Sequence, residues 1–332
     1  MTSPRDLIWE SEDTTRHDRR LKRPAVYALL ALVTLILGLN WPVMATGVQS
    51  ISPVWMGVFR VTGAFIVIIA ITSSSGNIRV PPRSDLPIVA SLALFRLALV
   101  FTLVFTGLEL LPPGRSSVIV WTASLWTVPM AAVFLGERMV GRRWLGLTLG
   151  ITGVVVLFEP WSVAWSQPNV ALGHVLLILA AIVNAATSVH IRAHRWSITP
   201  LQAIPWQLAG AGVVLVTLAM VTEGIPHIEW TPQLGWIVAY QGVLATGTAF
   251  WAQVVVLRNL AAVSANLTLM TTPVIGVLSS ALLLGEKITV TLVAGLLLII
   301  AGVGLNLLAD DSTGDSVTRG LGGRQASSGS NP

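Results

Sequence analysis

The chain has 332 residues, of which 54% are hydrophobic and only 11% are charged. Soluble globular proteins carry roughly 25% charged residues, so this composition excludes an ordinary soluble domain, a disordered chain and a fibrous chain. The net charge of +5 does not indicate nucleic-acid binding, because most basic residues lie in short segments between long apolar blocks. The absence of cysteine excludes disulfides, thiolate metal sites and cysteine nucleophiles.

Ten apolar blocks follow one another, each long enough to form a helix that crosses a bilayer of about 30 Å. They predict an all-α, polytopic membrane protein. The predicted transmembrane helices cover residues 25–46, 53–72, 86–107, 113–135, 141–158, 172–190, 200–221, 233–256, 262–284 and 288–308. We expect residues 1–24 and 309–332 to be disordered cytoplasmic tails.

The distribution of basic residues predicts the orientation. An even number of spans leaves both termini on one side of the membrane. Of the 20 Lys and Arg residues, Arg60 and Arg96 fall well inside spans, and the side opposite the termini carries only Arg115 and Lys287. Cytoplasmic loops carry the excess of Lys and Arg, so both termini are predicted to be cytoplasmic.

The second half of the chain repeats the first at an offset of 149 residues. Residues 88–90 read Ile-Val-Ala, as do residues 237–239, and Leu-Gly-Glu at 135–137 recurs at 284–286. The repeat unit is therefore five helices, covering residues 25–158 and then 172–308. Because five is odd, the second unit enters the membrane from the other side, and two inverted halves can open a central cavity to either face alternately. A duplication in a rigid receptor or scaffold is the alternative.

The two five-helix units resemble the paired EamA units of the drug/metabolite transporter superfamily. The most specific marks are Leu-Gly-Glu-Arg at 135–138, Leu-Gly-Glu-Lys at 284–287 and Thr-Pro-Val at 272–274. The first half departs from the pattern, with Ser124 where the second has Pro273. The resemblance implies a ten-helix transporter of small molecules in a bacterial inner membrane, without a cofactor. Within the superfamily the chain most resembles exporters of aromatic amino acids.

Arg96 is the most informative polar residue. It lies about ten residues, or roughly 15 Å, from either end of the third predicted helix, too deep for its side chain to reach water outside the bilayer. A guanidinium buried in the membrane needs water, backbone carbonyls or an anionic ligand. We therefore expect Arg96 to face a solvated cavity, with a structural role bonded to carbonyls as the alternative.

Other polar and aromatic residues away from the membrane interfaces extend this candidate site. Aromatic walls with a few convergent polar groups suit an amino acid, whose carboxylate would meet an Arg or Asn while its side chain lies against an indole. The expected substrate-binding residues are Arg96, Asn40, Trp121, Trp126, Tyr240, Trp251, Gln207, Asn266 and Arg60. Packing and interhelical hydrogen bonding are the alternative roles, and Arg60 is close enough to the outer surface to reach it instead.

Proline and glycine predict how the helices bend and pack. Pro42, Pro129 and Pro273 each remove a backbone donor inside a predicted helix, so we expect hinges there, with fixed kinks as the alternative. Small-residue faces on helices five and ten predict close helix packing, with a homodimer contact as a second use. These faces consist of Gly146, Gly150, Gly153, Gly295 and Gly302.

Missing motifs narrow the function further. Every Asp and Glu falls at a span end, in a loop or in a tail, which argues against proton or sodium coupling and favours facilitated exchange. No nucleotide-binding loop, zinc-type His-Glu-x-x-His or serine-nucleophile motif is present, so we expect neither an enzyme nor a metal site. An exporter of amino acids is the first hypothesis, and an efflux carrier for amphipathic cations or other metabolites is the runner-up. An intramembrane enzyme and a non-transporting receptor are the alternatives from other classes.

Overall fold

The computed structural model describes residues 23–74, 76, 78–137, 141–159, 167–226, 228–259 and 269–306. Regular structure in these residues is helical, without strands. Seven helices are long and apolar enough to cross a membrane: α1 (Arg23–Gly47), α2 (Pro53–Ser74), the run α3–η2–α4 (Leu86–Leu110), the run α5–α6 (Pro113–Leu135), α7 (Gly141–Phe158), α8 (Pro168–Ala193) and α9 (Pro200–Thr222). The predicted all-α membrane class is confirmed.

Three further helical stretches lie where the sequence predicts the last three spans. The first is continuous through α10 (Pro232–Ala239), the π-helical η4 (Tyr240–Thr248) and α11 (Ala249–Asn259). The others are α13 (Thr272–Leu284) and the helix Val290–Asn306. The count of ten spans stays a prediction, because these stretches do not meet the length and hydropathy that the seven helices above meet.

Several helices begin at a proline. Proline suits the first helical position, since its fixed φ favours the helix and the first amides have no helical acceptor. The prolines at these positions are Pro53, Pro113, Pro168, Pro200 and Pro232. Each also ends the preceding loop, so the chain reverses direction at a position set by local sequence.

Two carboxylates cap helix N-termini at the end of the bundle that we predict to be outside. Glu223, just after α9, accepts a hydrogen bond from the Val54 amide of α2 at 2.9 Å. Glu286, just after α13, accepts from the Gly114 amide at 2.7 Å and the Arg115 amide at 3.2 Å. These bonds satisfy amides that have no partner within their own helix. Burial raises the pKa of the Glu286 carboxyl above its ordinary value, and the two amide bonds offset this only partly.

At the opposite end, carboxylates connect loops of the two halves. Asp85 precedes α3 and accepts from the Ser197 amide at 3.0 Å and from His194 Nε2 at 3.1 Å. Burial alone would raise the pKa of Asp85, but the hydrogen bonds from His194 and Ser197 outweigh it and hold the pKa below its ordinary value. Glu137, after α6, accepts from Arg192 at the end of α8.

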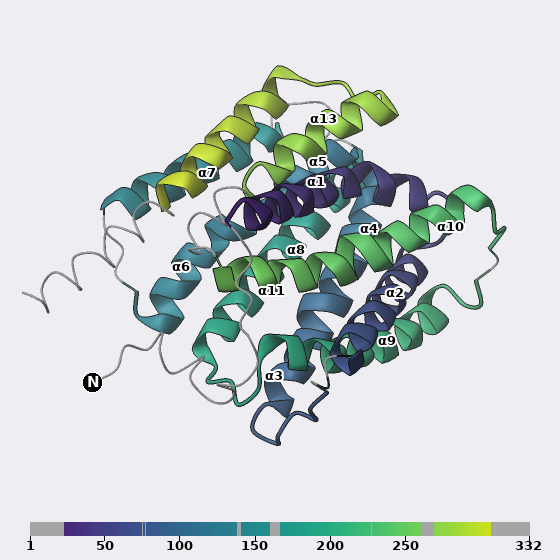
Figure 1. Ribbon diagram of the computed structural model, residues 1–332. Helices are drawn as coiled ribbons and strands as arrows, with labels where there is room; N and C mark the ends of the chain where they lie inside the picture. The colour runs from purple at the N-terminus through teal and green to yellow at the C-terminus, as the bar shows by residue number, and fades with distance from the viewer. Residues whose placement is uncertain are drawn as a thin grey trace, which may run out of the picture.

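Helices from the first half of the chain pack against helices from the second. Figure 1 shows α1 crossing the middle of the bundle beside α13 and α11, with α2 beside α9. In the same way α4 and α6 both contact α8. The centre of the molecule is therefore bounded by both halves, and any cavity there is lined by residues far apart in sequence.

Irregular features recur at the repeat spacing of 149 residues. The π-helical segment η2 (Leu92–Leu99) corresponds to η4 (Tyr240–Thr248). The helix interruption at Thr122, between α5 and α6, corresponds to the turn at Thr271, before α13. Gly136 and Gly285 each end a helix with a φ of 68°. These matching features support the five-helix repeat, and its inverted orientation stays a prediction.

The small-residue faces of the fifth and last helices contact each other within one chain. A Cβ at Gly146 of α7 would lie 2.6 Å from the Gly302 carbonyl oxygen, and a Cβ at Gly153 would lie 2.8 Å from the Gly295 carbonyl oxygen. Only glycine allows this approach. A homodimer stays a prediction, and it would have to use other faces of these two helices.

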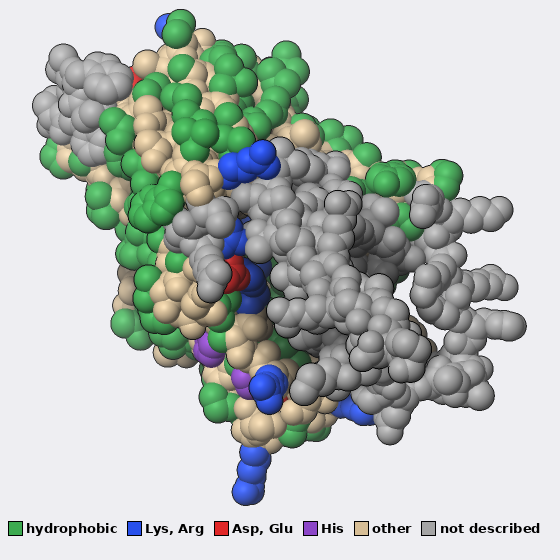
Figure 2. All heavy atoms as spheres, turned by 90° about the vertical axis from the view of Figure 1, so that its left-hand side faces the viewer, with side chains coloured by type: hydrophobic (Ala, Val, Ile, Leu, Met, Phe, Trp, Pro, Cys, Tyr) green, Lys and Arg blue, Asp and Glu red, His purple; other side chains and the backbone are tan. Residues whose placement is uncertain are grey.

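The surface of the bundle is largely apolar, as lipid contact requires. Side chains such as Val133, Phe134, Leu282 and Val290 are more than 70% exposed. Figure 2 shows hydrophobic side chains over much of one face, with Lys and Arg side chains clustered at its centre and lower edge. Exposed apolar side chains of this extent are unfavourable in water and favourable in a bilayer.

Candidate functional site

A cavity of about 280 Å³ lies at the centre of the bundle, where the two halves of the chain meet. Its size is near the lower limit of small-molecule sites, which enclose roughly 300–1,000 Å³. The residues that line it are Leu37, Asn40, Trp41, Met44, Arg60, Arg96, Leu97, Val100, Phe101, Val104, Val120, Trp121, Ala123, Ser124, Asn184, Ala245, Phe250 and Thr272. Apolar and aromatic side chains dominate, with a few polar groups among them.

Arg60 projects from α2 into this cavity rather than to the outer surface. Its side chain is 8% exposed. Nε donates to Thr246 Oγ1 at 2.8 Å, Nη1 donates to Gln241 Oε1 at 3.0 Å, and the guanidinium lies 4.6 Å from the centroid of the Phe101 ring. Gly63 and Gly242 allow this arrangement, because a Cβ at Gly63 would lie 2.8 Å from the Gly242 Cα, so α2 and η4 touch. Arg60 is thus held by neutral groups, and its positive charge is not neutralised by them.

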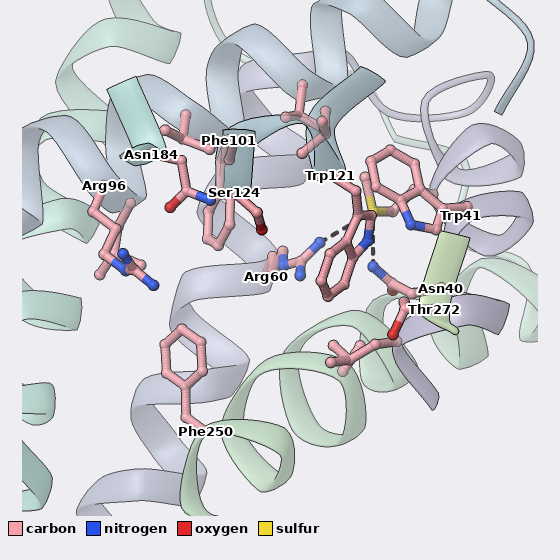
Figure 3. A pocket seen from close by; sticks show the side chains of 18 residues that line it. Asn40, Trp41, Arg60, Arg96, Phe101, Trp121, Ser124, Asn184, Phe250 and Thr272 are labelled. Atoms are coloured by element: carbon pink, nitrogen blue, oxygen red, sulfur yellow. Dashed lines mark hydrogen bonds between the residues drawn. The ribbon is translucent and has the colours of Figure 1, made fainter. Parts of the chain in front are cut away.

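Arg96 lines the cavity at some distance from Arg60. It belongs to the π-helical segment η2, and Figure 3 shows it near Asn184, on the far side of Phe101 from Trp121. Nη1 donates to Ser188 Oγ at 3.1 Å. The extra residue in each π turn changes the direction of side chains relative to an α-helix. Arg96 is thus among the lining residues, and its role toward a substrate stays a prediction.

Asn40 and Thr272 bring polar atoms to the other end of the cavity. Asn40 is 5% exposed and donates through Nδ2 to Met44 Sδ at 2.8 Å. Thr272 begins α13 and is 1% exposed. Within the described part of the chain, neither Asn40 Oδ1 nor Thr272 Oγ1 has a hydrogen-bond partner. Figure 3 shows both residues beside Trp121.

Aromatic rings form much of the remaining wall. Trp41 and Trp121 lie at the end near Asn40, Phe101 lies beside Arg60, and Phe250 lies opposite (Figure 3). Trp121 is the last residue of α5, directly before the interruption at Thr122. These rings offer flat apolar surfaces to a ligand that carries a polar group at one end.

Four sequence-predicted site residues are not in the cavity lining. Trp126 Nε1 donates to the Thr122 hydroxyl at 3.2 Å, and the Tyr240 hydroxyl donates to the Ile36 carbonyl at 2.7 Å. Trp251 packs against apolar clusters, and Gln207 is buried on α9. A further predicted site residue, Asn266, lies outside the described residues. The structure therefore brings together Arg96, Arg60, Asn40 and Trp121 from the predicted set.

The predicted hinge prolines occupy different positions in their helices. Pro42 lies inside α1, and Pro129 lies inside α6, which continues as a helix on both sides of it. The interruption of the fourth helix comes earlier, at Thr122. Pro273 lies in the first turn of α13, just after the corresponding turn at Thr271. Both interruptions adjoin cavity residues, so the backbone is irregular where it lines the cavity, as in membrane proteins generally.

Sequence reasoning did not include several residues that line the cavity. Trp41, Met44, Phe101 and Phe250 are apolar residues in apolar helices, so nothing distinguishes them from lipid-facing or packing residues. Thr272 and Asn184 carry a usable signal, because polar side chains within spans tend to face the protein interior. The family-like Thr-Pro-Val segment marks Thr272 as well.

Within the described part of the chain, no acidic residue balances the two guanidiniums. The helices that line the cavity contain no Asp or Glu except Glu109, which is near the C-terminal end of α4 and outside the lining. Residues 260–268 contain none either. Within the described residues, no group of three His, Asp or Glu side chains could hold a metal ion. The cavity is therefore an apolar space with excess positive charge.

Comparison with known proteins identifies the family. The EamA-like transporter family matches twice along the chain, over residues 25–159 and 171–308. The chain belongs to the EamA-like transporter family. The two matches nearly coincide with the two five-helix units predicted from the sequence.

Similar proteins carry transporter names. The uncharacterized transporter YoaV of Bacillus subtilis is 26% identical over 275 residues, covering 82% of this chain and 94% of YoaV. A probable amino-acid metabolite efflux pump of Escherichia coli is 26% identical over 293 residues, covering 84% of this chain and 93% of the pump. The uncharacterized inner membrane transporter YedA of Escherichia coli is 25% identical over 272 residues, covering 80% of this chain and 85% of YedA.

A solved crystal structure shares the fold. It aligns with a TM-score of 0.62 at 18% identity, covering 87% of this chain and 98% of the other. This EamA-like protein is therefore a multi-pass membrane transporter, and its family and relatives indicate a transporter rather than an enzyme.

Proposed function

We propose that this protein exports amino acids, aromatic and other neutral ones above all, across a bacterial inner membrane by alternating access. The single observation that carries the proposal is the central cavity, in which two guanidiniums face aromatic walls and have no acidic partner among the described residues. A carboxylate satisfies a guanidinium through charge-assisted hydrogen bonds, and an apolar side chain fits against the rings. The amino-acid metabolite efflux pump among the relatives supports the same substrate class.

The proposed mechanism uses the two repeats as rocking halves around the cavity. The matching irregular segments, η2 with η4 and Thr122 with Thr271, adjoin the cavity in both halves. With both termini cytoplasmic, the inverted arrangement would let each half adopt the other's conformation. Because the spans carry no acidic residue away from their ends, the substrate gradient supplies the direction of transport.

The runner-up substrate, an amphipathic cation, is disfavoured by charge. Carriers of cations offer carboxylates or uncommitted aromatic faces. Here Arg60 already lies over Phe101, and a second guanidinium lines the same space. An organic cation would be repelled by both.

Counterflow in proteoliposomes tests the proposal. Vesicles loaded with unlabelled phenylalanine should take up labelled phenylalanine from outside, whereas a receptor would bind without flux. Imposed pH or sodium gradients should not drive accumulation above equilibrium. Absence of counterflow with every neutral amino acid tested would overturn the substrate assignment, and gradient-driven accumulation would overturn the exchange mechanism.

A further inference from the structure

Two polar atoms in the cavity have no hydrogen-bond partner although they are buried. They are Asn40 Oδ1 and Thr272 Oγ1, within the described residues. A buried acceptor without a donor is unfavourable, and more than nine in ten buried polar groups in folded proteins are paired. Both atoms belong to residues that line the space proposed for the substrate. A ligand that brings hydrogen-bond donors would satisfy them.

These acceptors lie next to Arg60 rather than Arg96. Asn40 Nδ2 and Arg60 Nη1 both donate to one sulfur, Met44 Sδ, at 2.8 Å and 3.2 Å. Figure 3 shows these bonds and places Arg96 away from them. Close packing of α1 on α13 brings Thr272 to the same place, since a Cβ at Gly38 would lie 3.2 Å from the Thr272 carbonyl oxygen.

Resting on the proposed function, we propose that Arg60, Asn40 and Thr272 form a head-group site for a zwitterionic α-amino acid. The Arg60 guanidinium binds the carboxylate, while Asn40 Oδ1 and Thr272 Oγ1 accept hydrogen bonds from the α-ammonium. The side chain lies against Trp41 and Trp121.

The acceptors are neutral, so the charge of the ammonium is balanced by the ligand's own carboxylate. A bare amine lacks that balance beside two guanidiniums. A carboxylic acid without the amino group offers neither acceptor a donor. The site therefore distinguishes an amino acid from both of its truncated analogues, and Arg96 contributes positive charge from a distance.

Thr272→Val is the central test, because valine keeps the shape of threonine and removes only the hydroxyl. Proteoliposome flux is measured for phenylalanine and for 3-phenylpropanoate, which has the same ring and carboxylate but no amino group. We expect Thr272→Val to raise the half-saturating concentration of phenylalanine roughly tenfold and to leave that of 3-phenylpropanoate unchanged. Thr272→Ser should retain the wild-type preference.

Thr127→Val is the matched control, because the Thr127 hydroxyl donates to the Ala123 carbonyl of its own helix and lies outside the cavity lining. Thr127→Val should leave the half-saturating concentration of both substrates unchanged. If Thr272→Val does not fold, Asn40→Leu removes the other acceptor and is read in the same way. Arg60→Gln should impair the transport of both phenylalanine and 3-phenylpropanoate, because both carry a carboxylate.

Two results would overturn the head-group site while leaving amino-acid transport intact. One is an equal loss of phenylalanine transport and 3-phenylpropanoate transport in a folded Thr272→Val variant. The other is an unchanged half-saturating concentration for phenylalanine in that variant. A wild-type protein that transports none of the neutral amino acids tested would overturn the proposed function, and the head-group site with it.

Discussion

The two membrane-embedded arginines have different surroundings, and these set what each can do. Arg60 makes hydrogen bonds to Thr246, Gln241 and Met44, and it lies over Phe101. Among the described residues, Arg96 bonds to the Ser188 hydroxyl alone. Arg60 is therefore held in one geometry suited to orienting a ligand, whereas Arg96 contributes charge from a less constrained position.

Removing the Arg96 charge should weaken binding of carboxylates selectively. A unit charge several ångströms from a ligand contributes about 1–2 kcal/mol at an effective dielectric constant near 20, so Arg96→Ala should lower phenylalanine affinity roughly tenfold. Arg96→Lys keeps the charge and should therefore retain most of the wild-type affinity for phenylalanine. The affinity for phenethylamine, which has no carboxylate, should not fall. Competition assays with labelled phenylalanine measure both ligands.

Ser188→Ala is the control for this prediction, because it removes the Arg96 hydrogen bond and keeps the charge. It should reduce affinity much less than Arg96→Ala. Equal loss for acid and amine in a stably folded Arg96→Ala variant would remove Arg96 from any electrostatic role toward the substrate.

Asp85 should make the stability of the protein pH-dependent. Its pKa in the folded state is held below the ordinary value of 3.8, so its stabilising effect is present above about pH 4 and is lost as the pH falls through the lowered pKa. Asp85→Asn weakens the bonds to His194 and Ser197 and should cost about 1–2 kcal/mol at pH 7. The melting temperature in detergent should therefore be lower for the variant at pH 7, and the two proteins should converge in acid. A difference that stays constant down to pH 3 would contradict this assignment.

At the scale of the helix, the irregular backbone segments lie beside the cavity. The fourth helix breaks at Thr122 rather than at Pro129, and the corresponding turn at Thr271 precedes α13. Each interruption places a cavity residue beside it, Trp121 in one half and Thr272 in the other. Proline alone did not decide the position of the break, because a proline inside a helix is tolerated when neighbouring helices support the backbone.

The contact between α7 and the last helix should depend on glycine at single positions. A Cβ at Gly302 would lie 2.5 Å from the Gly146 carbonyl oxygen and 2.6 Å from the Gly150 amide nitrogen, both backbone atoms. Gly302→Ala therefore forces the helices apart and should cost about 1–3 kcal/mol, with a lower melting temperature in detergent. Gly304→Ala on the same helix is the matched control, since among the described residues its Cβ would meet only Met270 Cε at 3.9 Å. Equal melting temperatures for the two variants would argue against this packing.

At the scale of the molecule, the assigned orientation is open to a direct test. The chain has no cysteine, so single cysteines at Ser50, Gln167 or Ile225 can be labelled without background. Membrane-impermeant maleimide should label these three in intact cells. Cysteines at Arg79 or Arg195 should be labelled only after the membrane is permeabilised. Labelling of either cysteine from outside in intact cells would contradict the assigned orientation.

The amino-acid sequence by itself determined the class of the protein and the unit from which it is built. Apolar blocks of span length, basic residues concentrated in alternate loops and the recurring Leu-Gly-Glu segments all depend on local composition, which is readable without the fold. The polar residues Arg96, Arg60 and Asn40 were identifiable as candidates in the same way, because lipid offers no hydrogen-bond partner to a polar side chain within a span.

Only the tertiary structure decided which candidates share a cavity. Asn40 and Thr272 come from α1 and α13, which approach closely at Gly38, and Arg60 comes from α2, which touches η4 at Gly63. Trp126, Tyr240 and Trp251 look equivalent to Trp121 in sequence but lie outside the cavity lining. The direction in which a side chain points depends on helix rotation, π turns and crossing geometry, which arise from contacts between residues far apart in the chain.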